Sequence, residues 1–86
     1  MTQKKYRDRE FRRLRKLGWP YHIASRGAKH GLYEAIPHYG WEDMDDMTLG
    51  RTTYYKEETD EVLHLYEDGT FDVFCIHGKP LELYYD

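Results

Sequence analysis

The chain has 86 residues, of which 40% are hydrophobic, 16% aromatic and 34% charged, and its net charge is −3. This length suits one small domain with a limited core, and the aromatic content excludes the composition of a disordered protein. The single cysteine excludes an internal disulfide and a paired-cysteine zinc or redox site, and no apolar stretch has the length of a signal peptide or a membrane span. We therefore expect residues 1–86 to form a single cytoplasmic domain with no membrane partner.

Basic and acidic side chains are separated along the chain. Residues 1–18 carry eight basic and two acidic side chains, a balance of +6, whereas residues 19–86 carry five basic and fourteen acidic ones, a balance of −9. An asymmetry of this kind bears on binding partners or on pairing within the protein. It predicts a basic helix over residues 1–18 and an acidic, β-rich body over residues 19–86.

The first element in chain order is an amphipathic helix from Thr2 to Leu17. Its apolar residues share an arc of about 140° and are Tyr6, Phe11, Leu14 and Leu17. Thr2 is suited to the N-cap, and Gly18 before Trp19-Pro20 is typical of a helix C-terminus. The basic side chains lie on the opposite side, and only Arg7 projects from the apolar stripe.

The next segments are predicted to form strands and loops. Residues 21–26 and 32–36 are expected to pair as a hairpin around the glycine-containing turn 27–31. Residues 38–50 show no sustained period, which indicates a loop or a single helical turn. Residues 51–56 have the threonine and tyrosine content of a strand.

An antiparallel meander is predicted for the rest of the chain. Its strands span residues 62–66, 71–76 and 81–85, and Asp68-Gly69 is a hairpin turn signal. Cys75 falls in the second of these strands, where we expect it to pack as a small core residue. The predicted fold is α+β: an N-terminal amphipathic helix packed on an antiparallel sheet of about five strands, formed by the hairpin and the C-terminal meander.

The basic face of the predicted helix is the first candidate binding surface. Its residues are Lys5, Arg9, Arg12, Arg13 and Lys16. Clustered cations release counterions when they meet phosphates, and arginine binds phosphate or carboxylate through two parallel hydrogen bonds. A nucleic-acid backbone and an acidic groove on a protein are both suitable partners. The alternative is a face that is solvated or paired with the acidic body.

The second candidate surface is acidic. Its residues are Asp43, Asp45, Asp46, Glu57, Glu58, Asp60 and Glu61. Spaced carboxylates imitate a phosphate backbone and bind positively charged grooves, although the same residues also serve solubility. Tyr84 and Tyr85 are candidates for a tyrosine contact surface. The histidines and carboxylates match no metal-binding spacing, so we expect no metal or cofactor.

These surfaces favour a non-catalytic interaction protein. We expect it to dock by charge and tyrosines on a nucleic-acid-handling protein or a nucleoprotein. Small charge-polarised domains of this style occur among phage proteins that inhibit host defences, including anti-CRISPR proteins. Direct nucleic-acid binding through the basic helix is an alternative.

A further alternative comes from residues 10–19 (EFRRLRKLGW) followed by residues 26–33 (RGAKHGLY). Together they resemble HicA-type toxins, small domains that cleave messenger RNA. In that family a helix ending in Gly-Trp or Gly-Phe precedes two strands joined around a Gly-Ser-His turn with a catalytic histidine. The resemblance implies a ribonuclease with His30 as its catalytic residue. In this chain Arg26 and Lys29 flank His30, and we expect them to hold a phosphate while the imidazole acts as acid or base. This chain has Ala28-Lys29 where the family has serine.

Overall fold

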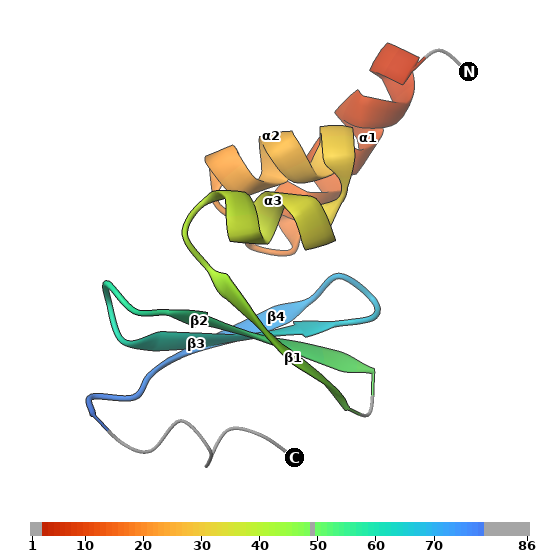
Figure 1. The fold of residues 1–86 in the computed structure, drawn as a ribbon. Helices are drawn as coiled ribbons and strands as arrows, with labels where there is room; N and C mark the ends of the chain where they lie inside the picture. The colour runs from red at the N-terminus through yellow and green to blue at the C-terminus, as the bar shows by residue number, and fades with distance from the viewer. Residues whose placement is uncertain (1–2, 49, 79–86) are drawn as a thin grey trace. The chain divides into compact units, whose positions relative to one another are not determined.

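The computed structural model describes residues 3–48 and 50–78, with the side chains of residues 3–5 and 45–48 excepted. The chain divides into two compact units, Met1–Tyr39 and Gly40–Asp86. The first unit contains the helices α1 (Gln3–Lys16), α2 (Tyr21–His30) and α3 (Leu32–His38). The second contains the strands β1 (Glu42–Thr48), β2 (Arg51–Lys56), β3 (Glu61–Tyr66) and β4 (Phe71–Cys75), as Figure 1 shows. The predicted α+β class is confirmed.

The helix α1 ends as its sequence predicts. Gly18 adopts a φ of 103°, a left-handed conformation that glycine allows without a Cβ clash. The Gly18 N–H donates to the carbonyl of Arg15, and the Trp19 N–H donates to the carbonyl of Leu14. This pair of hydrogen bonds defines a Schellman motif, and the accompanying apolar contact is expected between Trp19 and Leu14, both of which are buried. Thr2, the expected N-cap, lies outside the described residues.

The hairpin predicted for residues 21–36 is wrong, because this segment forms α2 and α3. The buried residues of α2 recur at helical spacing and are Ile23, Ala24, Gly27 and Ala28. Gly27 therefore lies inside a helix. Gly31 makes the sharp turn between the two helices with a φ of 92°. Gly31 lies at a turn, as expected, but the two segments that it joins are helices and not strands.

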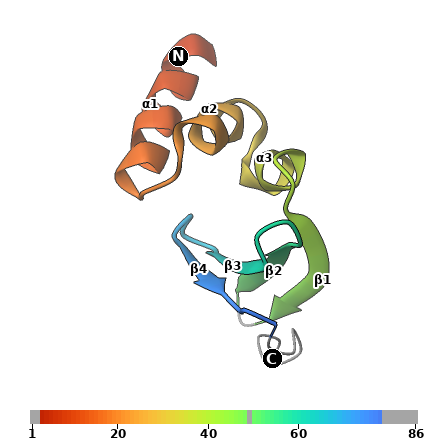
Figure 2. The same ribbon diagram turned by 90° about the vertical axis from the view of Figure 1, so that its left-hand side faces the viewer.

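The apolar stripe of α1 packs on α2, which Figure 2 shows beside it. Phe11 meets Tyr21 edge to face, with 5.4 Å between ring centroids. A Cβ added at Gly27 would lie 3.3 Å from the Leu14 side chain and 2.9 Å from that of Leu32, so the missing side chain permits the close approach. Burial along the stripe is uneven: Leu14 is fully buried, whereas Tyr6 is exposed.

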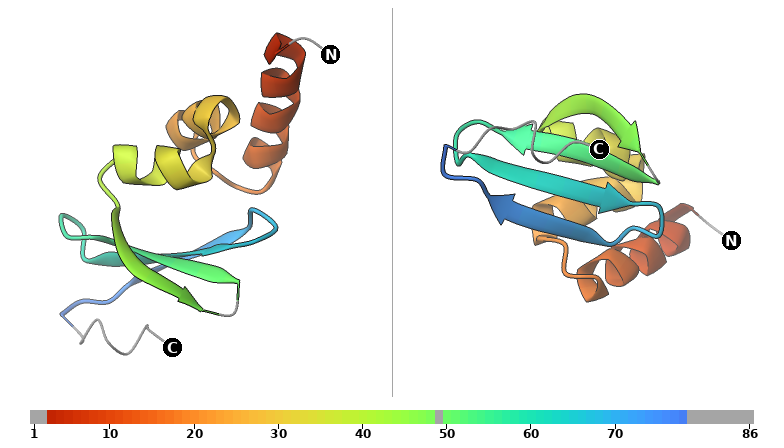
Figure 3. Two further views of the ribbon diagram at one scale, coloured as in Figure 1. Left: turned by 45° about the vertical axis from the view of Figure 1, so that its right-hand side comes forward. Right: turned by 90° about the horizontal axis from the view of Figure 1, so that it is seen from below.

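The second unit is an antiparallel sheet with the strand order β1-β2-β3-β4, which is visible from below in Figure 3. The predictions for residues 51–56, 62–66 and 71–76 are confirmed within one residue at each end, and the predicted turn at residues 67–70 joins β3 to β4. Residues 42–48, expected as a loop or helical turn, form β1 instead. A register irregularity between Asp43 and Met47 interrupts its pairing with β2. The strand expected at residues 81–85 lies outside the described residues.

The core of the sheet lies in β2 and β3. Its most buried residues are Thr53, Tyr54, Val62 and Leu63. β3 pairs with a strand on each side, and four successive residues, 62–65, are buried. Cys75 in β4 is exposed, so the expectation that it packs in the core is wrong. The periodicity of residues 71–76 identified a strand, but the described sheet pairs β4 on one side only.

A carboxylate stabilises the turn between β2 and β3. Asp60 has a left-handed φ of 56°. It accepts a hydrogen bond from the Gly78 N–H at 2.6 Å and another from the Tyr55 hydroxyl at 2.8 Å. These two donors, with a smaller contribution from the nearby His77, lower the pKa of Asp60, because they favour its charged form. The same contact raises the pKa of Tyr55.

This lowered pKa predicts a loss of stability in acid. A carboxyl group with a lower pKa in the folded state contributes stability above its unfolded pKa, near 3.9 for aspartate. That contribution disappears as the pH falls through the folded-state pKa. We expect the wild type to be more stable than Asp60→Asn at pH 7 and to lose this advantage in acid, at a pH well below the unfolded-state pKa. Urea denaturation at both pH values measures the difference.

Glu58→Gln is the matched control for this comparison. It removes the same charge from the same exposed turn. Its stability difference from the wild type is expected to change less between the two pH values. If Asp60→Asn kept its full deficit in acid, the two hydrogen bonds would not depend on the charge of Asp60.

Candidate functional site

The first candidate site is a line of cations on α1. Arg9, Arg12 and Lys16 are exposed and make no hydrogen bond or ion pair with any other residue that the structure describes. At about 100° per residue their positions fall within about 60° of one another around the helix, and Lys5 falls on the same line by its place in the sequence. We call these four positions the cation stripe. It extends over about 16 Å of helix.

The remaining arginines at the C-terminal end of α1 have structural partners. The Arg13 side chain donates to Glu10 through Nε at 2.7 Å and also forms an ion pair with it. Arg15 donates from Nη1 to the carbonyl of Trp19 at 2.8 Å, which satisfies a carbonyl beyond the helix end. Arg13 belonged to the predicted basic face, but the structure separates it from the cation stripe, because its charge is compensated within α1.

Charge divides at the boundary between the two units. Residues 1–39 carry ten basic and three acidic side chains, a net charge of +7, and residues 40–86 carry three basic and thirteen acidic ones, a net charge of −10. The separation is sharper than the sequence predicted, since α2 and α3 were assigned to the acidic body. Each unit therefore presents charge of predominantly one sign.

The predicted acidic residues are only partly brought together. Antiparallel pairing sets Glu42 opposite Tyr55, so the start of β1 lies beside the turn that carries Glu57 and Glu58. Lys56 is opposite Glu61 in the register, and Asp60 is engaged by Tyr55 and Gly78. Asp43 lies opposite Tyr54. The side chains of Asp45 and Asp46, and all of Tyr84 and Tyr85, lie outside the described parts of the chain.

His30 is exposed at the last position of α2, and Gly31 follows it directly. Arg26, expected to hold phosphate beside it, instead binds Glu34 of α3 through two parallel hydrogen bonds, from Nε to Oε2 at 2.8 Å and from Nη2 to Oε1 at 2.7 Å. This pairing lowers the pKa of Glu34 and raises that of Arg26. The two strands that the HicA resemblance implied are helices. The ribonuclease hypothesis itself stays a prediction.

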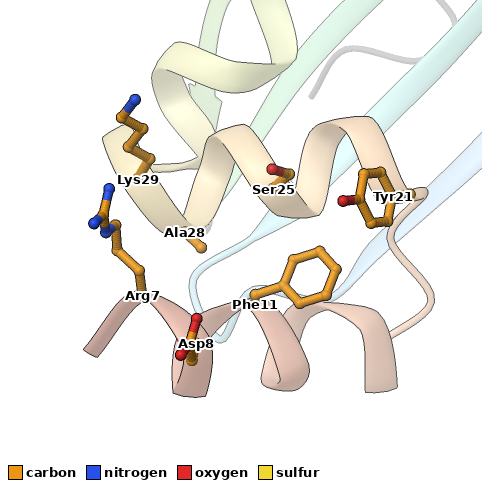
Figure 4. A pocket seen from close by; sticks show the side chains of 7 residues that line it. All are labelled: Arg7, Asp8, Phe11, Tyr21, Ser25, Ala28 and Lys29. Atoms are coloured by element: carbon orange, nitrogen blue, oxygen red, sulfur yellow. The ribbon is translucent and has the colours of Figure 1, made fainter. Parts of the chain in front are cut away.

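A pocket of about 350 Å³ lies between α1 and α2. Its lining comes from α1 (Arg7, Asp8 and Phe11) and from α2 (Tyr21, Ser25, Ala28 and Lys29). Figure 4 shows the cationic groups of Arg7 and Lys29 at one end, and the rings of Phe11 and Tyr21 at the other. This pocket was not predicted from the sequence, because residues 21–26 were expected to form a strand. The projection of Arg7 from the apolar stripe was the available signal.

A thiol and an imidazole lie close together at the end of β4. Cys75 Sγ lies 3.7 Å from Nδ1 of His77. No group of three or more histidine, cysteine, aspartate or glutamate side chains in the described ranges is arranged to hold a metal ion. Among the described helices, none has the length and apolar character needed to cross a membrane.

Comparisons with protein-family models, curated proteins and solved structures found no match to this chain. Within its described residues, the chain is an α+β protein with a basic unit of three helices and an acidic unit with a four-stranded sheet.

Proposed function

We propose that this chain is a non-catalytic binding protein whose helical unit docks on nucleic-acid phosphates within a nucleoprotein. The observation that supports the proposal is the cation stripe, whose described side chains are exposed and do not pair with other described residues. A structural role for these cations would require partners within the protein, like those of Arg13 and Arg26. Their availability favours an external anionic partner.

The length of the stripe favours a polynucleotide over an isolated anion. Cations repeat over about 16 Å, and a polynucleotide offers regularly repeated anions over that distance. A single small anion would engage one or two of them. The acidic unit, with a net charge of −10, is repelled by phosphates, so it suits the protein component of the nucleoprotein. Inhibition of a host nucleic-acid-handling complex, as by anti-CRISPR proteins, is the role that such docking would serve.

Two neighbouring arginines provide the test. Arg12→Gln removes a cation of the stripe, and Arg13→Gln removes a neighbouring exposed cation that is paired with Glu10. We expect Arg12→Gln to reduce the slope of log affinity against log salt for fluorescein-labelled duplex DNA by about 0.9. At about 50 mM salt this corresponds to an affinity about 15-fold lower. Fluorescence anisotropy over a salt series measures both quantities.

Arg13→Gln is the control, and its affinity is expected to stay within about threefold of the wild type, since its charge is already compensated. Equal losses in the two variants would show that net charge alone governs binding, and the docking face on α1 would be wrong. Absence of any binding to the duplex at low salt would remove phosphate docking altogether.

A further inference from the structure

The pocket between α1 and α2 has two chemically different ends. Tyr21 is 68% exposed and meets Phe11 at an interplanar angle of 77°. A planar ring that stacks on one of these side chains would therefore present its edge or face to the other. At the opposite end, Arg7 and Lys29 are exposed and have no hydrogen-bond or ion-pair partner within the described residues (Figure 4).

The order of these groups matches a single molecule that carries a planar ring and an anion. Tyr21 and Lys29 are eight residues apart on α2, which is about 12 Å along the helix. Ser25 lies between them, and the buried Ala28 leaves room beside Lys29. Asp8 is a hydrogen-bond acceptor, and the Ser25 hydroxyl is both donor and acceptor. The polar edge of a base would form hydrogen bonds with these two groups. A phosphate carries the negative charge that Arg7 and Lys29 complement.

We infer that this pocket binds one unpaired nucleotide of a nucleic-acid strand, with its base on Tyr21 and Phe11 and its phosphate at Arg7 and Lys29. The inference rests on the proposed function, because it takes the strand to be held by the cation stripe. On α1 the pocket residue Asp8 and the stripe residue Arg12 are one turn apart, so the pocket adjoins the stripe at Asp8, whereas Arg7 and Phe11 lie on the other side of the helix. The pocket adds a preference for single strands over duplexes, whose bases are stacked and paired.

The test uses two single strands that differ only in their bases. One is a labelled oligodeoxyadenylate, and the other is an abasic strand of the same length and charge. We expect Tyr21→Ala to lower affinity for the oligodeoxyadenylate by about 5- to 150-fold, the range for loss of one base stack. Its affinity for the abasic strand is expected to equal that of the wild type.

Two variants control for changes in folding and in surface composition. Tyr21→Phe retains the ring and is expected to retain affinity. Tyr33→Ala removes a tyrosine of similar exposure, 58%, from α3, which does not line the pocket. It is expected to bind both strands like the wild type. Lys29→Gln should weaken binding to both strands, because each retains its phosphates.

The outcomes distinguish a failure of the nucleotide pocket from a failure of the proposed function. If Tyr21→Ala bound the oligodeoxyadenylate as tightly as the wild type, while Arg12→Gln still reduced the salt dependence, the nucleotide pocket would be wrong and phosphate docking would stand. If the wild type bound neither strand nor duplex, the proposed function itself would fail. Adenosine monophosphate that bound as tightly as the strand would overturn the assignment to a strand, since it lacks contacts to the cation stripe.

Discussion

Replacing Trp19 with alanine is expected to lower the free energy of unfolding by about 3 to 5 kcal/mol, the largest effect of any single substitution proposed for this chain. Trp19 has no exposed surface and directly follows the Schellman motif glycine of α1. Alanine keeps the backbone hydrogen bond to Leu14 and removes the indole, so the loss comes from packing. A chain of 86 residues has a total stability between about 4 and about 13 kcal/mol, of which this is a large share.

Urea denaturation followed by circular dichroism measures this loss. Tyr6→Ala is the control, because Tyr6 is an aromatic residue of the same unit that is more than half exposed. Its substitution is expected to cost less than about 1 kcal/mol. A loss of similar size in both variants would contradict the burial of Trp19 as the cause. Trp19→Phe should restore part of the stability, because it refills most of the cavity.

Neutralising the three described cations of the stripe is expected to produce the largest functional effect. The triple variant Arg9→Gln, Arg12→Gln and Lys16→Gln should reduce the salt slope for duplex DNA by about 2.7. At about 50 mM salt, this corresponds to an affinity about 3 × 10³-fold lower. The three side chains are exposed, so the variant is expected to keep the stability of the wild type within about 1 kcal/mol.

The control for the triple variant retains every charge. Arg9→Lys, Arg12→Lys and Lys16→Arg exchange one cation for another, and counterion release depends on the number of charges. This variant should keep the wild-type salt slope. If it lost as much affinity as the neutral variant, binding would depend on the identity of each side chain and not on the number of charges. The proposed docking of the cation stripe on phosphates would then be wrong.

Both sequence and structure identify α1, and the reasons are local. Its apolar residues repeat at helical spacing, and Gly18 before Trp19-Pro20 ends the helix in the expected way. The strands β2, β3 and β4 were predictable for similar reasons, since they are rich in β-branched and aromatic residues and are separated by turn signals. These features depend on neighbours within a few residues.

The missed elements depend on contacts between distant residues. Glycine favours turns, but Gly27 lies inside α2, where its missing side chain leaves room for those of Leu14 and Leu32. The acidic residues of β1 have low strand propensity, and pairing with β2 makes that segment a strand. Packing and backbone pairing outweigh local preference at both places.

The sequence by itself determined the α+β class, the strongly basic α1 and the separation of charge along the chain, because these properties follow from residue order and short-range periodicity. Only the tertiary structure decided which cations remain available and where a pocket forms. Arg13 and Arg26 look like Arg12 in the sequence, but carboxylates reached through a helical turn or across Gly31 bind them. The pocket exists because α2 is a helix packed on α1, which brings Arg7 and Phe11 together with Tyr21 and Lys29.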